Sequence, residues 1–230
     1  MDSTSHSVFI TGGTGYLGRP LITRLLERGH QVRALVRPGS QDKLPAGCEA
    51  VVGNALDPAS YTDHIHPADT FVQLVGVSHP SPSKAAQFRS VDLVSASGAV
   101  KAATGARIQH FVYLSVAHPA PVMKAYVHTR VECEALIRDS GLNATVLRPW
   151  YVLGPGHRWP YALLPLYRLM ELFPRTRPGA LRLGLVTRPQ MTRALVQAVE
   201  HPCRGLRIVG VPEIRAQNGF PASQQAAKSA

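Results

Sequence analysis

The stretch Val8-Phe-Ile-Thr-Gly-Gly-Thr-Gly-Tyr-Leu-Gly-Arg19 decides the fold that the rest of the chain can adopt. A short apolar run ends at Ile10, a glycine-rich turn follows, and an amphipathic segment extends from Tyr16 to Arg28. This order of strand, tight turn and helix is typical of a site that binds the phosphates of a dinucleotide.

The three spaced glycines of this turn each meet a separate requirement. Gly12 permits a sharp turn, Gly15 lets the backbone approach a pyrophosphate, and Gly18 lets the helix pack closely on the strand. A bound phosphate would then meet free N–H groups at the positive end of the helix dipole. Glycine turns occur in many proteins, so the turn needs support from the rest of the chain.

Composition limits the class of protein. The chain has 230 residues, which suits one domain or one domain with a small appendage. Its net charge of +11 is dispersed, with no basic run, zinc finger or RNA-binding aromatic motif, so specific nucleic-acid binding is not favoured. The three cysteines lie far apart, and we expect neither a disulfide framework nor a metal site.

The sequence also bears on location and assembly. No apolar run reaches the ~18 residues of a membrane span, so we expect no transmembrane segment. The polar start, Met1–Ser7, lacks the layout of a signal peptide, and we expect a cytoplasmic protein. A monomer and a homodimer both remain open.

Strand and helix patterns alternate along most of the chain. We expect strands at 31–36, 50–53, 70–75, 110–115 and 144–149, and helices at 85–104 and 125–140. This alternation predicts an α/β fold with a doubly wound parallel sheet. After Trp150 the pattern changes to an apolar stretch at 161–173, a helix at 189–201 and a strand at 206–209. We therefore expect one domain over 1–215, with a small C-terminal extension from about 150, and a disordered tail over 216–230.

Arg37 indicates which dinucleotide would bind. Ligands of parallel sheets lie at the carboxyl ends of the strands, and the residue roughly 20 positions past the glycine turn meets the adenosine ribose. An acidic residue there would repel a 2′-phosphate, whereas Arg37 would attract one. The sequence thus favours NADP(H) over NAD(H), with Arg33 as a weaker candidate helper and an exposed surface arginine as the alternative interpretation.

Two further strand ends carry candidate cofactor contacts. Asp57 could accept from the adenine amino group, and it could also cap the helix that opens at Pro58. Val75 and Gly76 end the next strand, where a small backbone turn would let the cofactor lie close.

Several motifs together resemble one known family. Thr11-Gly-Gly-Thr-Gly-Tyr-Leu-Gly18 is similar to the TGxxGxxG turn of short-chain dehydrogenase/reductases, in particular their extended and atypical branches, which include epimerase/dehydratases and NmrA-like proteins. Gly53–Asp57 resembles the family's G-D-x-x-D segment, with Asn in place of the first Asp. The run Leu147–Gly156 resembles the LRPxxxxGPG segment.

The resemblance implies a Rossmann fold and a set of cofactor contacts. The matched turn would hold the cofactor through Gly12, Thr14, Gly15, Tyr16, Leu17 and Gly18. Pro149 and Val152 would line the nicotinamide.

The resemblance also implies a reaction, hydride transfer to or from a carbonyl or alcohol carbon. Tyr126 would be the general acid/base and Ser115 would orient the carbonyl oxygen. Arg130 stands where the family has the lysine that binds ribose and lowers the tyrosine pKa. Arginine is cationic but bulkier and differently shaped, and Asp92 stands about where many members have asparagine. The proton relay is therefore altered.

Two functions from different classes follow. One is an NADPH-dependent oxidoreductase that acts on a small carbonyl or alcohol substrate, with the apolar stretch 161–173 as a lid. The other is a non-catalytic NADP(H)-binding redox sensor or scaffold, which the replacement of lysine by Arg130 favours. The apolar stretch could instead form a dimer face or touch a membrane surface.

Overall fold

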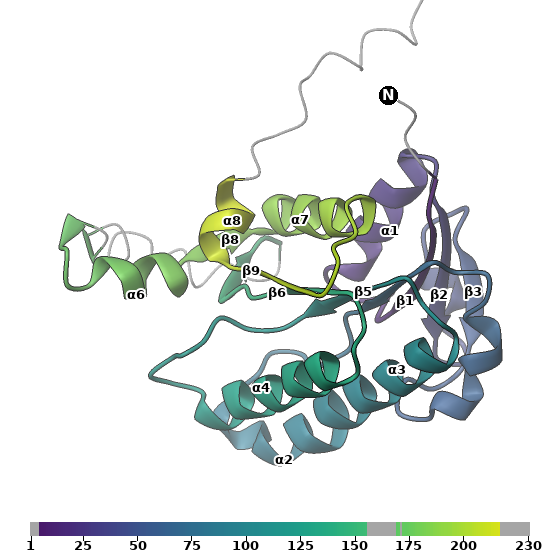
Figure 1. Cartoon of the computed structure of the whole chain (residues 1–230), viewed down its shortest axis with the longest axis horizontal. Coiled ribbons are helices and arrows are strands. Elements are labelled where there is room, and N and C mark those ends of the chain that lie inside the picture. Colours follow the sequence, from purple (N-terminus) through teal and green to yellow (C-terminus); the bar gives the residue numbers. More distant parts are fainter. Residues whose placement is uncertain (1–4, 156–168, 171, 217–230) are drawn as a thin grey trace, which may run out of the picture.

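The centre of the protein is a parallel sheet. A computed structural model describes residues 5–155, 169–170 and 172–216, and the sheet in it has seven strands in the order β3-β2-β1-β4-β5-β6-β9. Every pair in this sheet is parallel, which confirms the predicted doubly wound α/β class (Figure 1). The strands are β1 (Ser7–Thr11), β2 (Gln31–Val36), β3 (Glu49–Val52), β4 (Thr70–Gln73), β5 (His110–Leu114), β6 (Ala144–Leu147) and β9 (Leu206–Val209).

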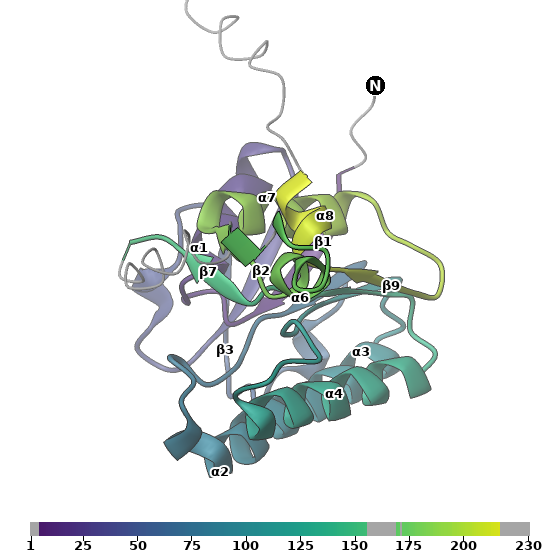
Figure 2. The ribbon, with the colours of Figure 1, turned by 90° about the vertical axis from the view of Figure 1, so that its left-hand side faces the viewer.

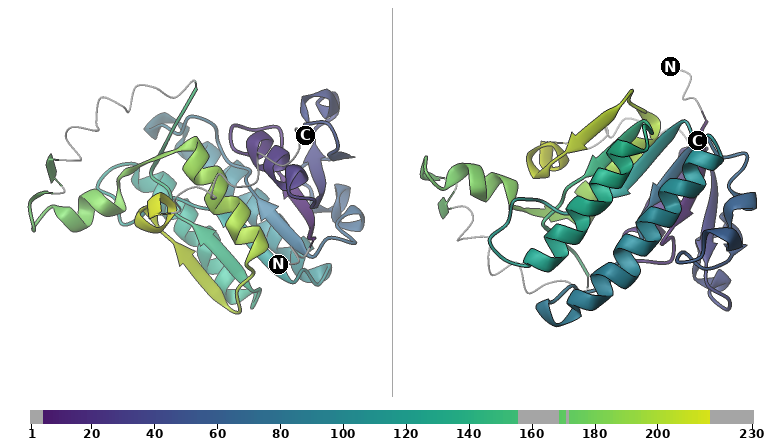
Figure 3. Two further views of the ribbon diagram at one scale, coloured as in Figure 1. Left: turned by 90° about the horizontal axis from the view of Figure 1, so that it is seen from above. Right: turned by 60° about the horizontal axis from the view of Figure 1, so that its bottom comes forward.

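Helices cover both faces of the sheet. Figures 1 and 2 show α1 (Gly18–Glu27) and α7 (Arg188–Glu200) on one face, and α3 (Val94–Gly105) and α4 (Lys124–Asp139) on the other. The two views of Figure 3 look onto these faces in turn, with purple α1 beside green α7 in the first and the teal helices in the second. The remaining short helices are α2 (Ala85–Gln87), α6 (Arg177–Arg182) and α8 (Val211–Ala216), with 3₁₀ turns at Gln41–Lys43, Pro58–Ser60, Thr62–His64 and Pro82–Lys84.

Strand alternation divides the apolar core into two layers. Phe9, Phe71 and Phe111 occupy neighbouring strands and pack in a row with ring centroids 5.3 Å apart, on the side that α3 and α4 cover. The next residues along the same strands, including Ile10 and Val72, point to the opposite layer, against α1 and α7. Because successive strand side chains face opposite sides, both layers form from continuous apolar runs.

The glycine-turn helix ends as the sequence predicts. Gly29 has φ of +83°, a conformation that glycine adopts without a steric cost. The N–H of Gly29 donates to Leu26 O at 3.0 Å and the N–H of His30 donates to Leu25 O at 3.1 Å. These two bonds form a Schellman motif, which satisfies the last carbonyls of α1 and directs the chain into β2.

The structure differs from the sequence prediction in several places, and it contains the short helices α6 and α8, which were not predicted. The helix expected at 85–104 is not uniform, because a π-helical turn at Phe88–Leu93 separates α2 from α3. The strands β7 (Tyr151–Leu153) and β8 (Leu185–Thr187) form a second, two-stranded parallel sheet that the sequence pattern did not indicate, since three-residue strands carry too little periodicity.

The segment after residue 150 contributes to the main sheet as well as to the two-stranded one, because β9 pairs with β6. Most of the apolar stretch 161–173, and the tail from 217, lie outside the described residues. Among the described residues, no helix is long and apolar enough to cross a membrane.

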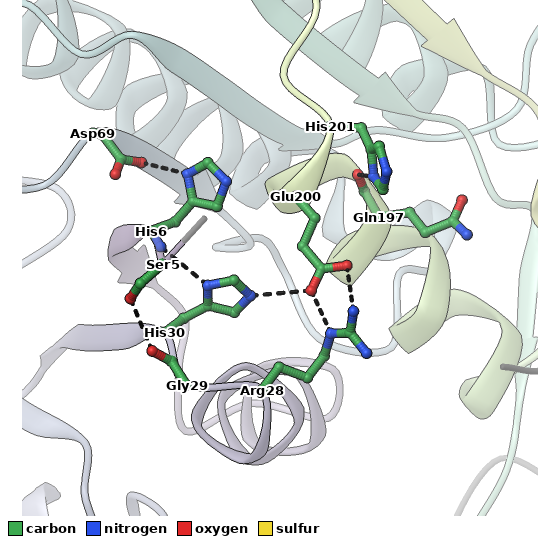
Figure 4. A network of polar contacts seen from close by, with 9 residues as sticks. All are labelled: Ser5, His6, Arg28, Gly29, His30, Asp69, Gln197, Glu200 and His201. Atoms are coloured by element: carbon green, nitrogen blue, oxygen red, sulfur yellow. Dashed lines mark hydrogen bonds and ion pairs between the residues drawn. The ribbon is translucent and has the colours of Figure 1, made fainter. Parts of the chain in front are cut away.

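A polar network links the N-terminal strand, α1 and α7 (Figure 4). His30 accepts from the backbone N–H of His6 through Nδ1 at 3.1 Å, so its Nε2 carries the proton and donates to Glu200 at 3.1 Å. Arg28 donates to both carboxylate oxygens of Glu200. His6 in turn lies 3.2 Å from Asp69. The network therefore fastens the end of α7 to the end of α1.

Replacing Glu200 by glutamine is expected to lower the free energy of unfolding by about 1–3 kcal/mol, because two donors lose a charged acceptor. Burial raises the pKa of Glu200, but the hydrogen bonds from Arg28 and His30 and the charge of Arg28 outweigh it and hold that pKa below its ordinary value of 4.5. The contribution is thus present above 4.5 and is lost as the pH falls through the lower folded-state pKa. Chemical denaturation across this range measures the effect.

The control for this prediction is Glu27→Gln, since Glu27 pairs with Arg24 on the exposed face of α1. Its stability should stay within about 0.5 kcal/mol of the wild type. An equal loss in both variants, or a difference between Glu200→Gln and wild type that persists well below pH 4.5, would contradict the role of the network.

Candidate functional site

The glycine turn has the geometry of a phosphate cradle. Gly12 has φ of +77°, and its carbonyl accepts from the N–H of Gly15 at 3.0 Å, which closes the turn. A Cβ at position 18 would overlap Gly12 O and lie 2.6 Å from Gly13 O. Gly13, which the sequence analysis left without a role, packs so closely on Ala34 that a Cβ would lie 2.9 Å from it. The backbone of the turn thus lies directly against strand and helix.

The first turn of α1 is open to an anion. No side chain caps the helix at Leu17, and its first turn holds no acidic residue. The free N–H groups and the positive end of the helix dipole therefore have no internal partner of opposite charge. Gly15, at the tip of the turn, is exposed. A pyrophosphate fits these residues.

The glycine turn is linked to the next strand end by close backbone contact. A Cβ on Gly12 would lie 3.0 Å from the Leu74 carbonyl carbon and 3.1 Å from Val75 N, so the turn lies against the end of β4. A Cβ on Gly76 would overlap the Arg130 guanidinium. The predicted residues Gly12, Val75, Gly76 and Arg130 therefore lie side by side at one edge of the sheet.

Arg130 is held in a buried cluster. Its Nη2 forms an ion pair with Asp92, whose side chain is fully buried, and its Nη1 donates to Tyr113 Oη at 3.1 Å and to Leu114 O at 2.8 Å. The second oxygen of Asp92 accepts from Val77 N at 3.1 Å. Asp92 lies in the π-helical turn, so this turn positions both the guanidinium and the loop after β4.

Tyr126 lies one helical turn before Arg130 on α4, as the sequence spacing predicts. The Arg130 Cζ is 5.2 Å from the centre of the Tyr126 ring, and Phe88 packs against that ring with centroids 5.0 Å apart. Burial raises the pKa of Tyr126, and the Arg130 cation only partly opposes this effect. The phenol therefore carries its proton at neutral pH.

Ser115 is buried in a second polar cluster. Its hydroxyl donates to Glu134, which also pairs with Arg148 and lies 3.4 Å from His118. Ser115 is 3% exposed and Glu134 is 1% exposed. The serine proton is thus committed to a carboxylate, which leaves the oxygen lone pairs as the remaining hydrogen-bonding capacity of this side chain.

The other predicted cofactor residues lie at or near strand ends. Arg37 is exposed directly after β2. Asp57 caps the 3₁₀ turn at Pro58, because its Oδ1 accepts from Ala59 N at 3.2 Å. The weaker candidate, Arg33, donates from its guanidinium to Glu49 at 2.9 Å and to the His66 carbonyl at 2.6 Å.

The last two residues predicted to contact the cofactor, Pro149 and Val152, lie in the segment after β6. Pro149 is buried, and its carbonyl accepts from Ala117 N at 2.8 Å. Val152 lies in β7 and pairs in register with Val186 of β8.

Sequence reasoning missed Tyr113, Glu134 and Arg188. Glu134 follows Arg130 by four residues, so the same helical periodicity that relates Tyr126 to Arg130 indicates it. Nothing local indicates Tyr113, which is buried within β5, or Arg188, which comes from α7 and whose Cζ lies 5.3 Å from the centre of the Tyr16 ring.

The comparison with known proteins agrees with this geometry. Residues 12–166 match a family model described as NAD(P)H-binding. The chain belongs to this NAD(P)H-binding family. The matched range contains the glycine turn, Arg37, Asp92 and Arg130.

Two curated proteins share part of the sequence with this chain. A 4-hydroxy-2-methyl-3-oxo-4-farnesyl-3,4-dihydroquinoline-1-oxide ketoreductase of Stigmatella aurantiaca is 27% identical over 168 residues, which cover 64% of this chain and 50% of that protein. The photosystem II assembly factor Ycf39 of Cyanophora paradoxa is 29% identical over 150 residues, covering 62% and 44%. The chain spans about half the length of these relatives.

A solved structure extends the likeness over most of the chain. The Bordetella bronchiseptica enzyme WbmH in complex with NAD+ superimposes with a TM-score of 0.68 and 24% identity, over 90% of this chain and 76% of that one. This likeness confirms the Rossmann fold. Together with the family match, it bears out the resemblance to extended short-chain dehydrogenase/reductases.

Proposed function

We propose that the protein is an NADP(H)-dependent oxidoreductase that reduces a small carbonyl compound. One observation carries the proposal: the row from Gly12 through Val75 and Gly76 to Arg130 and Tyr126 joins a phosphate-binding turn to a protonated phenol. A bound reduced nicotinamide would supply the hydride. The ketoreductase relative from Stigmatella aurantiaca supports this class of reaction.

Within this proposal the chain's own residues divide the work of binding and proton transfer. Tyr126 donates a proton to the substrate oxygen, and Arg130 places a cation beside the phenol and beside Gly76. Ser115 acts as a hydrogen-bond acceptor toward ligand, because Glu134 takes its proton. In this assignment Ser115 orients the substrate without donating to it.

In this proposal the chain has one cofactor domain over 1–215, with a small C-terminal extension from about 150. The described end of the stretch 161–173 exposes Leu169, Leu172 and Phe173, at 53%, 76% and 56%. An apolar segment of this kind supports a lid over a small, apolar substrate.

Replacing Arg37 by glutamine is expected to weaken NADPH binding about tenfold or more and to leave NADH binding unchanged. The reason is that only NADPH carries the 2′-phosphate that a guanidinium after β2 would hold, and a charge-assisted hydrogen bond contributes about 1.5–3 kcal/mol. Fluorescence titration with both cofactors measures the ratio. Equal affinities in the wild type, or an unchanged ratio in the variant, would refute the preference for NADP(H).

Turnover tests the proposed reaction directly. Wild-type protein is incubated with NADPH and a panel of ketones and aldehydes, and NADPH oxidation is followed by absorbance. We expect oxidation that depends on the carbonyl compound. Firm NADPH binding without turnover on a broad panel would count against the enzyme.

A second function is favoured by one specific observation. Arg130 is tied to Asp92, Tyr113 and Leu114 O, so the residue in the place of the family's lysine also serves a structural cluster. This supports a protein that binds NADP(H) as a redox sensor or scaffold, and one relative is named as an assembly factor. A partner protein whose binding changes between NADP+ and NADPH, together with no turnover, would establish it.

A further inference from the structure

An open cleft of about 480 Å³ lies beside the glycine turn. Thr14, Gly15 and Tyr16 of the turn line it, together with Arg19 and Arg188. Arg188 comes from the start of α7, far from the turn in sequence. The tertiary fold therefore brings a second arginine to the phosphate cradle.

Both arginines stand at the ends of helices where cations are unfavourable. Arg19 is the second residue of α1 and Arg188 is the first residue of α7, and neither helix has an acidic residue in its first turn. A helix N-terminus carries partial positive charge, so each guanidinium adds to charge of the same sign. A cation therefore stands at an unfavourable helix N-terminus twice beside the glycine turn. Such a repeated exception indicates a function that needs the positive charge.

Neither charge is neutralised by the parts of the chain that the structure describes. Among those residues, no carboxylate forms an ion pair with Arg19 or Arg188. Arg188 instead stacks on the Tyr16 ring, with Cζ 5.3 Å from the ring centre. The cleft thus presents two guanidinium groups to a ligand beside the first turn of α1.

The position of Arg188 is fixed by its surroundings. Thr187 and Gln190 form a reciprocal capping box, in which Thr187 N donates to Gln190 Oε1 at 2.8 Å and Gln190 N donates to Thr187 Oγ1 at 3.3 Å. Gly154 leaves room for the stack, because a Cβ there would overlap the Tyr16 hydroxyl and lie 3.2 Å from Arg188 Cβ. Arg188 is therefore held beside the turn before any ligand arrives.

We propose that Arg188 and Arg19 bind the pyrophosphate of the dinucleotide from the side opposite the glycine backbone. Guanidinium groups suit this role because their planar donors pair with phosphate oxygens in two-point contacts. The proposal rests on the NAD(P)H binding that the family match shows and is independent of the proposed reduction. It separates two anion sites, with the pyrophosphate at Arg188 and the 2′-phosphate at Arg37.

The test compares Arg188→Gln with Arg37→Gln by fluorescence titration. Arg188→Gln is expected to weaken NADPH and NADH equally, about tenfold, since both carry a pyrophosphate and tenfold corresponds to about 1.4 kcal/mol. Arg24→Gln is the matched control, because Arg24 lies on the exposed face of α1 and pairs with Glu27. It should bind both cofactors like the wild type.

Fragments distinguish a lost contact from a disturbed fold. Inorganic pyrophosphate and adenosine 2′-monophosphate are each used to displace NADPH. In Arg188→Gln, pyrophosphate should compete more weakly while adenosine 2′-monophosphate competes as before, and the reverse should hold for Arg37→Gln. Unchanged cofactor affinity in Arg188→Gln, or an equal loss for both fragments, would overturn the proposal whether or not any carbonyl compound is reduced.

Discussion

Tyr126→Phe is expected to slow carbonyl reduction about 10²–10⁴-fold, the range that a positioned general acid contributes. The variant keeps the ring that packs on Phe88 and faces Arg130 and loses only the hydroxyl. NADPH affinity should therefore remain within about twofold of the wild type, since the change in binding energy is small. Stopped-flow measurement of NADPH oxidation and fluorescence titration give the two quantities separately.

A matched tyrosine separates proton donation from packing around Arg130. Tyr113 accepts a hydrogen bond from the same guanidinium but is fully buried. Tyr113→Phe should cost about 1 kcal/mol of stability and leave most of the turnover rate intact. If Tyr113→Phe lost as much activity as Tyr126→Phe, the effect would belong to the Arg130 cluster.

The pH dependence of reduction offers an independent check on Tyr126. Burial raises its pKa above the ordinary 10.0, with Arg130 opposing. A proton donor loses activity as the pH rises through its pKa, so no loss from Tyr126 is expected below about pH 10. A fall in rate near neutral pH that disappears in Tyr126→Phe would show that the bound cofactor lowers the pKa of Tyr126. A fall that persists in Tyr126→Phe would assign the essential proton to another group and contradict the role of Tyr126.

Gly18→Ala is expected to weaken NADPH binding about tenfold to a hundredfold and to destabilise the protein by about 1–3 kcal/mol. The added Cβ would overlap Gly12 O and approach Gly13 O to 2.6 Å, and both are backbone atoms that no side-chain rotation can move. The turn must open, and the N–H groups that would face a bound pyrophosphate shift with it. Titration and thermal unfolding measure the two losses.

The control for this substitution is Gly105→Ala at the end of α3. A Cβ at Gly105 meets open space, so binding and stability should both match the wild type or improve slightly. Wild-type affinity in Gly18→Ala would mean that the pyrophosphate does not bind at this turn.

Much of the fold was accessible from sequence because it depends on local patterns. The apolar runs of β1, β2, β4 and β5 and the periodicity of α1 identify a parallel sheet without reference to distant contacts. The π-helical turn at Phe88–Leu93 could not be predicted from the sequence. It is stabilised around Asp92 by Arg130 and by Val77 N, and both of these are distant from Asp92 in sequence.

The candidate site divides in the same way. Tyr126 and Arg130 were predicted from their spacing on one helix, and the structure places them together. The partner of Ser115 was not predicted. Glu134 lies on α4, contacts Ser115 just after β5 and also binds Arg148 after β6.

By itself the sequence determined the sheet, the glycine turn and the residues that follow each strand. A turn such as Gly12–Gly18 is specified by backbone freedom and by the next few residues, and these are local properties of the chain. Only the tertiary structure decided which charges meet there. Arg188 reaches Tyr16, and Asp92 pairs with Arg130, because helices far apart in the chain pack at one edge of the sheet. Electrostatic interactions depend on distance in space, and no local pattern encodes that distance.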